Sequence, residues 1–331
     1  MKISREPVAK AAPSPGAVRG ARTFDNTGAP LIFCMERVLR FSRLDGPMLN
    51  PDDLSMMTEQ EKLDLLRQIG EAEECQDCFE PIYRRLLEDE SPQVRQEAVA
   101  ALWDLADPRH VEPLMRMAEG DPDDEVRAKA ASVLGIYIYE AVVDGSLDEP
   151  RYLSVRSFLL DLAQNPRENL LVRRMALEAL SFDADETVHD LIDWAYRHPA
   201  VEVRMTALFA MGRSRSARWT ESILAELDSP ERQLQLEAIN AAAEAGLGIA
   251  TPKLRNLAVN KDREIRLAAI WSLANTRGPG ALETLEMCAQ SEDEEIRDAA
   301  GDALDEFYHA SRADDEEADD YGQSDDETEE E

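Results

Sequence analysis

Val203-Arg204-Met205-Thr206-Ala207-Leu208-Phe209-Ala210-Met211-Gly212 is the stretch of sequence that decides the fold, because its pattern recurs along the chain. Each copy begins with a β-branched residue or leucine and has alanine four positions later. The second residue of the copies falls at positions 95, 127, 173, 204, 235, 266 and 297, so successive copies lie 32, 46, 31, 31, 31 and 31 residues apart. A fixed period of this length predicts a chain built from stacked structural repeats.

One copy encodes one face of a helix. We number the first residue of each copy as position 0; apolar or small residues then fall at 0, +4, +7 and +8, as expected for 3.6 residues per turn. A shorter apolar pattern precedes each copy and predicts a second helix. Turn signals with proline lie between the two, at Ser91-Pro92, Asp121-Pro122, Asn165-Pro166, His198-Pro199 and Ser229-Pro230. We expect each pair to begin the following helix, and the helix pairs to stack because neither helix buries its apolar face alone.

The V-R-x-x-A-x-x-A-L core of these copies resembles the HEAT repeat, in particular the short repeats of phycobilisome lyases. The resemblance covers about residues 58–311. It implies an all-α, right-handed HEAT-like α-solenoid of about seven helix pairs, with the V-R helices on the concave side. Gln235 stands where the other copies have arginine, so a continuous arginine ladder would be interrupted there.

The remaining sequence predicts the domain organisation. Residues 1–50 have a net charge of +4, show no sustained period and are expected to be disordered; a basic transit segment and a start codon placed too early are alternatives. Residues 51–312 form the predicted solenoid, closed by a helix at Glu59–Ile69 and interrupted by an insertion at about 135–150. The last helix is expected to end near His309, and residues 313–331 to form an acidic disordered tail.

Composition limits the classes of function. The formal net charge of −33 argues against nucleic-acid binding. No apolar run is long enough for a membrane span, and no signal-peptide core is visible, so we expect a cytoplasmic monomer. Cys75 and Cys78 have the spacing of half a metal site, but without a second pair we interpret them as core or surface cysteines. The sequence indicates no cofactor and no catalytic group, and no His-Glu pair of the kind that deoxyhypusine hydroxylase uses for iron.

Positions +2 and +6 lie away from the buried face and should point into the groove. Three successive copies, the fourth to the sixth, place large apolar side chains there, and Trp103 at +9 of the first copy extends the set. Apolar groups on a polar surface, with Trp, Phe and Met among them, are typical of a protein-binding site. The predicted anchors are Met205, Phe209, Leu236, Leu267, Trp271 and Trp103. Burial between repeats is the alternative for each of them.

We interpret the repeated arginines as structural, because a residue that recurs with the repeat is explained by contacts within the fold better than by a single binding site. Acids just upstream are their expected partners: Asp124, Glu202, Asp262 and Glu294. The sequence therefore predicts a non-catalytic scaffold that binds a partner protein, favouring a basic one through its acidic surface and tail. The alternative, implied by the resemblance alone, is a protein that handles or attaches a bilin, as phycobilisome lyases do.

Overall fold

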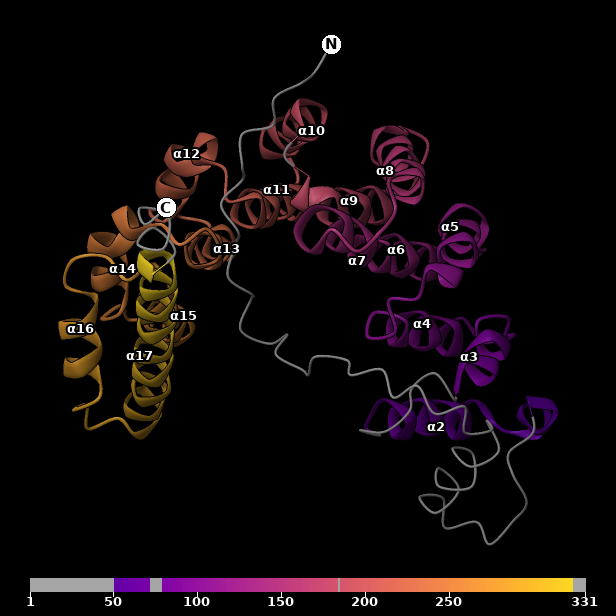
Figure 1. The fold of residues 1–331 in the computed structure, drawn as a ribbon, viewed down its shortest axis with the longest axis horizontal. Coiled ribbons are helices and arrows are strands. Elements are labelled where there is room, and N and C mark those ends of the chain that lie inside the picture. The colour runs from indigo at the N-terminus through magenta and orange to yellow at the C-terminus, as the bar shows by residue number, and fades with distance from the viewer. Residues whose placement is uncertain (1–50, 72–78, 184, 324–331) are drawn as a thin grey trace, which may run out of the picture. The chain divides into compact units, whose positions relative to one another are not determined.

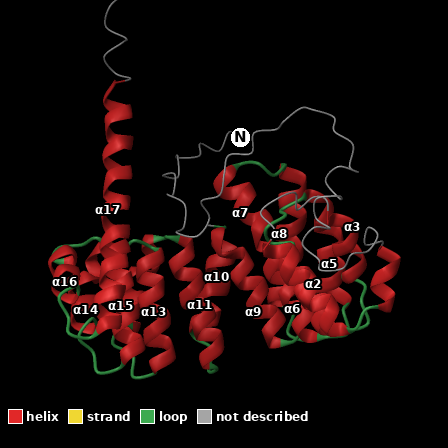
Figure 2. Ribbon diagram, turned by 90° about the horizontal axis from the view of Figure 1, so that it is seen from below, coloured by secondary structure: helices red, strands yellow, loops and turns green. Residues whose placement is uncertain are grey.

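The computed structural model describes residues 51–71, 79–183 and 185–323, and within these ranges the chain is helical with no strand (Figure 2). The predicted disordered segment 1–50 and the Cys75/Cys78 pair lie outside the described residues. Internal contacts divide the chain into two compact units, one ending at Phe182 and the other beginning at Asp183. The all-α solenoid class is confirmed in each unit, which is a two-layer stack of helix pairs.

The first unit contains one layer of helices that carry the V-R pattern and a second layer packed against it. Helix α2 contacts α4, α4 contacts α6, and α6 contacts α9, while α3, α5 and α8 each pack on the V-R helix that follows them. Short 3-10 turns precede α2 (Pro51–Met56) and α5 (Pro108–His110) and follow α9 (Leu180–Phe182). The bounds are α2 Glu59–Glu71, α3 Glu80–Leu86, α4 Pro92–Ala101, α5 Val111–Gly120, α6 Asp124–Val133, α7 Gly135–Tyr139, α8 Glu149–Gln164 and α9 Leu170–Ala179.

The second unit repeats this plan. Helices α11, α13, α15 and α17 lie side by side in sequence order, and α10, α12, α14 and α16 pack against them (Figure 1). Short 3-10 turns lead into α12 (Ala217–Trp219) and α14 (Gly248–Ala250). The bounds are α10 Glu186–Tyr196, α11 Val201–Ser214, α12 Thr220–Glu226, α13 Arg232–Glu244, α14 Thr251–Leu257, α15 Arg263–Thr276, α16 Ala281–Cys288 and α17 Glu294–Gln323.

The core follows the repeat register. The alanine at position +4 is fully buried in all seven copies, and the residue at position 0 is at most 9% exposed. Glycines allow still closer approach at position +9: a Cβ on Gly212 would lie 2.7 Å from the Cα of Ala241, and one on Gly135 would lie 3.0 Å from the Cα of Ala179. In both pairs the glycine meets the alanine at +7 of the next copy, so backbone touches backbone between α11 and α13 and between the start of α7 and the end of α9.

Most V-R helices begin later than the proline signals predicted. Ser91 does cap α4, where its Oγ accepts from the Val94 N–H at 3.4 Å. At the next copy the cap is Asp123, and the Asp121 carboxylate instead accepts from the Asp123 N–H at 2.9 Å. The other caps are Asn169, Ala200 and Glu231. The prediction failed there because the proline-containing pairs form the turn between helices, and the helix starts only after it.

The insertion and the last helix also have defined structure. After α6 the chain continues as α7 and one π-helical turn at Glu140–Asp144, and Gly145, with φ of +65°, ends it. The last helix continues to Gln323, well past the predicted end near His309 (Figure 2). Residues 310–321 contain neither glycine nor proline and include three alanines and two glutamates, so local propensity allows a helix despite four aspartates and the like charges. The predicted acidic tail thus begins as the last turns of α17.

Candidate functional site

Two helix starts position the candidate site in the second unit. Asp262 caps α15, and its Oδ1 accepts from the N–H groups of Glu264 and Ile265 at 3.0 and 3.2 Å. Asp293 stands at the start of α17 in the same way, accepting from the Glu295 N–H at 3.2 Å. Because both helices start at the same point of the repeat, their +2 and +6 positions come side by side.

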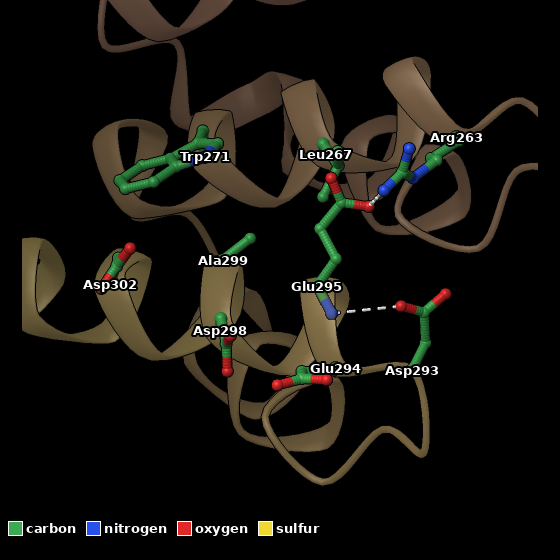
Figure 3. A pocket seen from close by; sticks show the side chains of 9 residues that line it. All are labelled: Arg263, Leu267, Trp271, Asp293, Glu294, Glu295, Asp298, Ala299 and Asp302. Carbon is green, nitrogen blue, oxygen red and sulfur yellow. Dashed lines mark hydrogen bonds and ion pairs between the residues drawn. The ribbon is translucent and has the colours of Figure 1, made fainter.

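A hollow of about 660 Å³ lies along these two helices (Figure 3). Its floor combines apolar residues of α15 with one small residue of α17, and its rim is acidic. We call it the Trp271 hollow; it is lined by Arg263, Leu267, Trp271, Asp293, Glu294, Glu295, Asp298, Ala299 and Asp302. Leu267 and Asp298 are both at +2, and Trp271 and Asp302 are both at +6, so the register predicted from sequence is what brings them together.

Trp271 is held with its ring toward this hollow by buried neighbours. Ile270 and Ser272, the residues before and after it in α15, are buried, and the Ser272 hydroxyl donates to the backbone carbonyl of Ile239 on α13 at 3.1 Å. This bond fixes the rotation of α15 against α13. As a result, the Trp271 side chain remains 42% exposed, a large apolar surface in contact with water.

The electrostatics of the hollow are one-sided. Five of its lining residues are acidic, and Arg263, the cation among them, forms an ion pair with Glu295. Asp298 and Asp302 are exposed, and within the described part of the chain neither has a hydrogen bond or ion pair. The hollow therefore offers two uncompensated carboxylates, one helical turn apart, beside an indole ring.

The structure brings together only some of the predicted anchors. Leu267 and Trp271 share the hollow, and Leu267 is half-buried. Met205, Phe209 and Leu236 are half-buried on α11 and α13. Trp103 is 38% exposed and lies in the first unit, just beyond the end of α4.

Phe209 differs from the other anchors because its ring is covered. The guanidinium of Arg213, one turn further along α11, lies 4.7 Å from the centroid of the ring, and the same guanidinium is 3.8 Å from Glu244. A partner would have to displace this arginine to reach the ring. The apolar positions alone did not predict the hollow or its two aspartates. The sequence signal for it is that Asp298 and Asp302 occupy the same repeat positions as Leu267 and Trp271.

A second hollow, of about 500 Å³, follows the end of α10. Its lining residues are Asp190, Asp193, Trp194, Arg197, His198 and Pro199. Trp194 is 37% exposed, and its ring meets that of His198 edge to face at 5.3 Å. Asp193 is engaged by Arg197 and Arg218, both at 3.0 Å, so of the two aspartates that line this hollow only Asp190 has an unpaired carboxylate within the described part of the chain.

The repeated arginines act within the fold, as predicted, but through a different bond. In six copies the +1 side chain donates to a backbone carbonyl in the segment before its own helix, where carbonyls at the end of the preceding helix lack partners. The bonds are Arg95 to Asp89 (2.8 Å), Arg127 to Asp121 (2.8 Å), Arg173 to Ala163 (3.0 Å), Gln235 to Leu227 (2.7 Å), Arg266 to Asn260 (3.1 Å) and Arg297 to Ser291 (3.0 Å). Gln235 makes this bond in the fifth copy, so the series of bonds is interrupted not there but in the fourth copy, where Arg204 pairs with Glu226.

The expected acid partners are correct at one copy only. Arg127 pairs with Asp124 at 2.5 Å. Arg204 pairs instead with the buried Glu226 at 2.8 Å, and Asp262 pairs with Arg232 at 2.6 Å. The prediction failed because it considered only acids close in sequence, whereas the stack brings acids of neighbouring helices within reach.

Arg95 makes the most buried of these contacts. It is 8% exposed and donates to both carboxylate oxygens of Asp121, at 2.8 and 2.7 Å. These bonds raise the pKa of Arg95. The bidentate pair joins the first copy to the segment before the second.

Metal-ligating residues do not gather in the described ranges. His110 and His189 are buried, and Cys288 is a buried free thiol. Over residues 51–71, 79–183 and 185–323, no three His, Cys, Asp or Glu side chains are placed to hold a metal ion. None of the helices in these ranges is both long and apolar enough to cross a membrane.

The sequence similarity to known proteins lies in the repeated part of the chain. Residues 79–145 and 220–305 match the model of HEAT repeats, so the predicted resemblance to that family is confirmed. No curated protein matches the chain in sequence.

Several solved structures are similar in backbone. The complex of CpcE and CpcF of phycocyanin lyase from Nostoc is 17% identical, with a TM-score of 0.48, over 80% of this chain and 90% of that one. Escherichia coli YibA is 15% identical, with a TM-score of 0.43, over 76% and 98%. Yeast importin-β is 14% identical, with a TM-score of 0.45, over 78% of this chain and 37% of that one.

Proposed function

We propose that this chain is a non-catalytic scaffold that binds a basic partner protein on the +2/+6 surface of its second unit, with the Trp271 hollow at the centre of the contact. The observation that carries the proposal is the 42% exposed Trp271 in a hollow with an acidic rim. Exposed tryptophan surrounded by polar groups is typical of the residues that dominate binding energy at protein interfaces.

The charge of the molecule supports a basic partner. The chain has a formal net charge of −33, and the hollow concentrates that charge at Asp298 and Asp302, which have no internal partner in the described structure. An acidic surface accelerates encounter with a basic protein and discourages acidic ones. Leu267 and the half-buried Met205 and Leu236 add apolar area to the same register on neighbouring helices.

Affinity capture with matched variants tests the proposal. The full chain is immobilised as wild type, as Trp271→Ala and as Trp194→Ala, and the proteins retained from a lysate of the native source are identified by mass spectrometry. Trp194 is the matched control, because it is a tryptophan of similar exposure, 37%, on α10 of the same unit.

The expected result is a basic protein that is retained by wild type and by Trp194→Ala, lost with Trp271→Ala, and released by moderate salt. Cross-linking should then join that protein to α15 or α17. If Trp271→Ala retains the same proteins as wild type, or if the cross-links fall on other helices, this surface is not the docking site.

A further inference from the structure

The shape and chemistry of the Trp271 hollow indicate which basic side chain it accepts; this inference rests on the proposed function. Trp271 and Asp302 occupy the same repeat position on neighbouring helices, and Figure 3 shows both at the same end of the hollow. Asp298 lies one turn before Asp302 on α17. A flat aromatic face and two carboxylates therefore line the same hollow.

Arginine and lysine would use this arrangement differently. A guanidinium is planar and weakly hydrated, so it stacks on an aromatic ring while its in-plane N–H groups donate to carboxylates. A lysine ammonium is a compact, strongly hydrated charge that meets one group at a time. A guanidinium is therefore the better match for a site that offers an indole face together with carboxylates.

The hollow already contains one guanidinium, that of Arg263, and this cation pairs with only one of the five acidic residues. Arg263 pairs with Glu295 at the end of the hollow next to the start of α17 (Figure 3). Asp298, Asp302 and Trp271 are left without such a cation in the rest of the hollow, and the volume of the whole hollow, about 660 Å³, leaves room for an added side chain. We propose that this part of the hollow binds an arginine side chain of the partner protein and discriminates against lysine.

The experiment uses two short probes and the full chain. Acetyl-Gly-Arg-Gly-amide and its lysine counterpart are titrated while the indole N–H signals of the four tryptophans are followed by nitrogen–proton NMR. The Trp271→Phe variant assigns the signal of Trp271. Asp302→Asn removes one carboxylate of the hollow, and Asp305→Asn is the control, because Asp305 is exposed on the same helix but does not line the hollow.

The arginine peptide should shift the Trp271 signal with an affinity at least about fivefold higher than that of the lysine peptide. Asp302→Asn should abolish this preference, and Asp305→Asn should preserve it. Equal binding of the two peptides, or a shift confined to another tryptophan, overturns the arginine inference. If capture of the partner still depends on Trp271 in that case, the proposed function stands and only the choice of side chain is wrong; if capture is also independent of Trp271, both are wrong.

Discussion

Replacing Gly212 with alanine separates packing from helix propensity, because the two predict changes of opposite sign in the free energy of unfolding. Gly212 lies inside α11, and alanine in a helix interior is favoured over glycine by about 1 kcal/mol. The added Cβ, however, would lie 2.7 Å from the Cα and 3.0 Å from the Cβ of Ala241 on α13. The obstructing atom is backbone, so α11 and α13 must move apart as whole helices.

The magnitude follows from these two terms. Overpacking a close-packed interior costs about 1–3 kcal/mol, and an obstruction by backbone belongs at the upper end of that range. Subtracting the propensity gain leaves a net loss of about 2 kcal/mol. Gly301 is the control: it lies in α17, and a Cβ there meets nothing within 4 Å. Gly301→Ala should therefore stabilise the chain by up to about 1 kcal/mol.

Urea unfolding followed by circular dichroism measures both variants. The midpoint should fall for Gly212→Ala and rise for Gly301→Ala, with the slope unchanged. Should Gly212→Ala raise the midpoint as much as Gly301→Ala does, α11 and α13 are not in backbone contact, and the register of the second unit is wrong.

Three further outcomes are expected. Arg95→Met should cost about 3 kcal/mol in urea unfolding, because it leaves Asp121 buried without its bidentate partner, whereas the exposed Arg297→Met should cost less than about 1 kcal/mol; equal losses would contradict the role of burial. Burial holds the pKa of His110 below its usual 6.5. As the pH falls through 6.5, the imidazole is therefore protonated more readily in the unfolded chain than in the folded one, and the free energy of unfolding should fall. His110→Gln should lose less stability than wild type between about pH 7.5 and about pH 5.5, and parallel pH profiles would refute this. Trp271→Ala should change the free energy of unfolding by less than about 1 kcal/mol, and a large fall in melting temperature would place the ring in the core.

The fold was predictable because a single periodic pattern encodes both packing and helix. Position 0 and the alanine at +4 are buried in every copy, as the spacing required. Helix starts were predicted less well: the same proline signal begins a helix at Ser91 but forms a turn at Asp121. Sequence spacing alone does not distinguish a helix start from a turn, because the difference depends on the partners of the Asp121 carboxylate, which accepts from Arg95 and from the Asp123 N–H.

The candidate site was predictable only in part. The repeat register placed Leu267 and Trp271 on the surface where the hollow lies. It could not show that Arg213 covers Phe209, because that contact depends on a rotamer within one helix. Nor could it show that Arg204 selects Glu226, which is distant in sequence and becomes a neighbour only after the helices stack.

The bond from the +1 side chain to a carbonyl just before its own helix has a consequence for how such a chain changes length. Since donor and acceptor belong to the same thirty-odd residues, duplicating or deleting one copy carries both along and leaves no orphaned carbonyl behind. Six of the seven copies are in this respect interchangeable modules, in which either arginine or glutamine makes the bond; in the fourth copy Arg204 pairs with Glu226 instead.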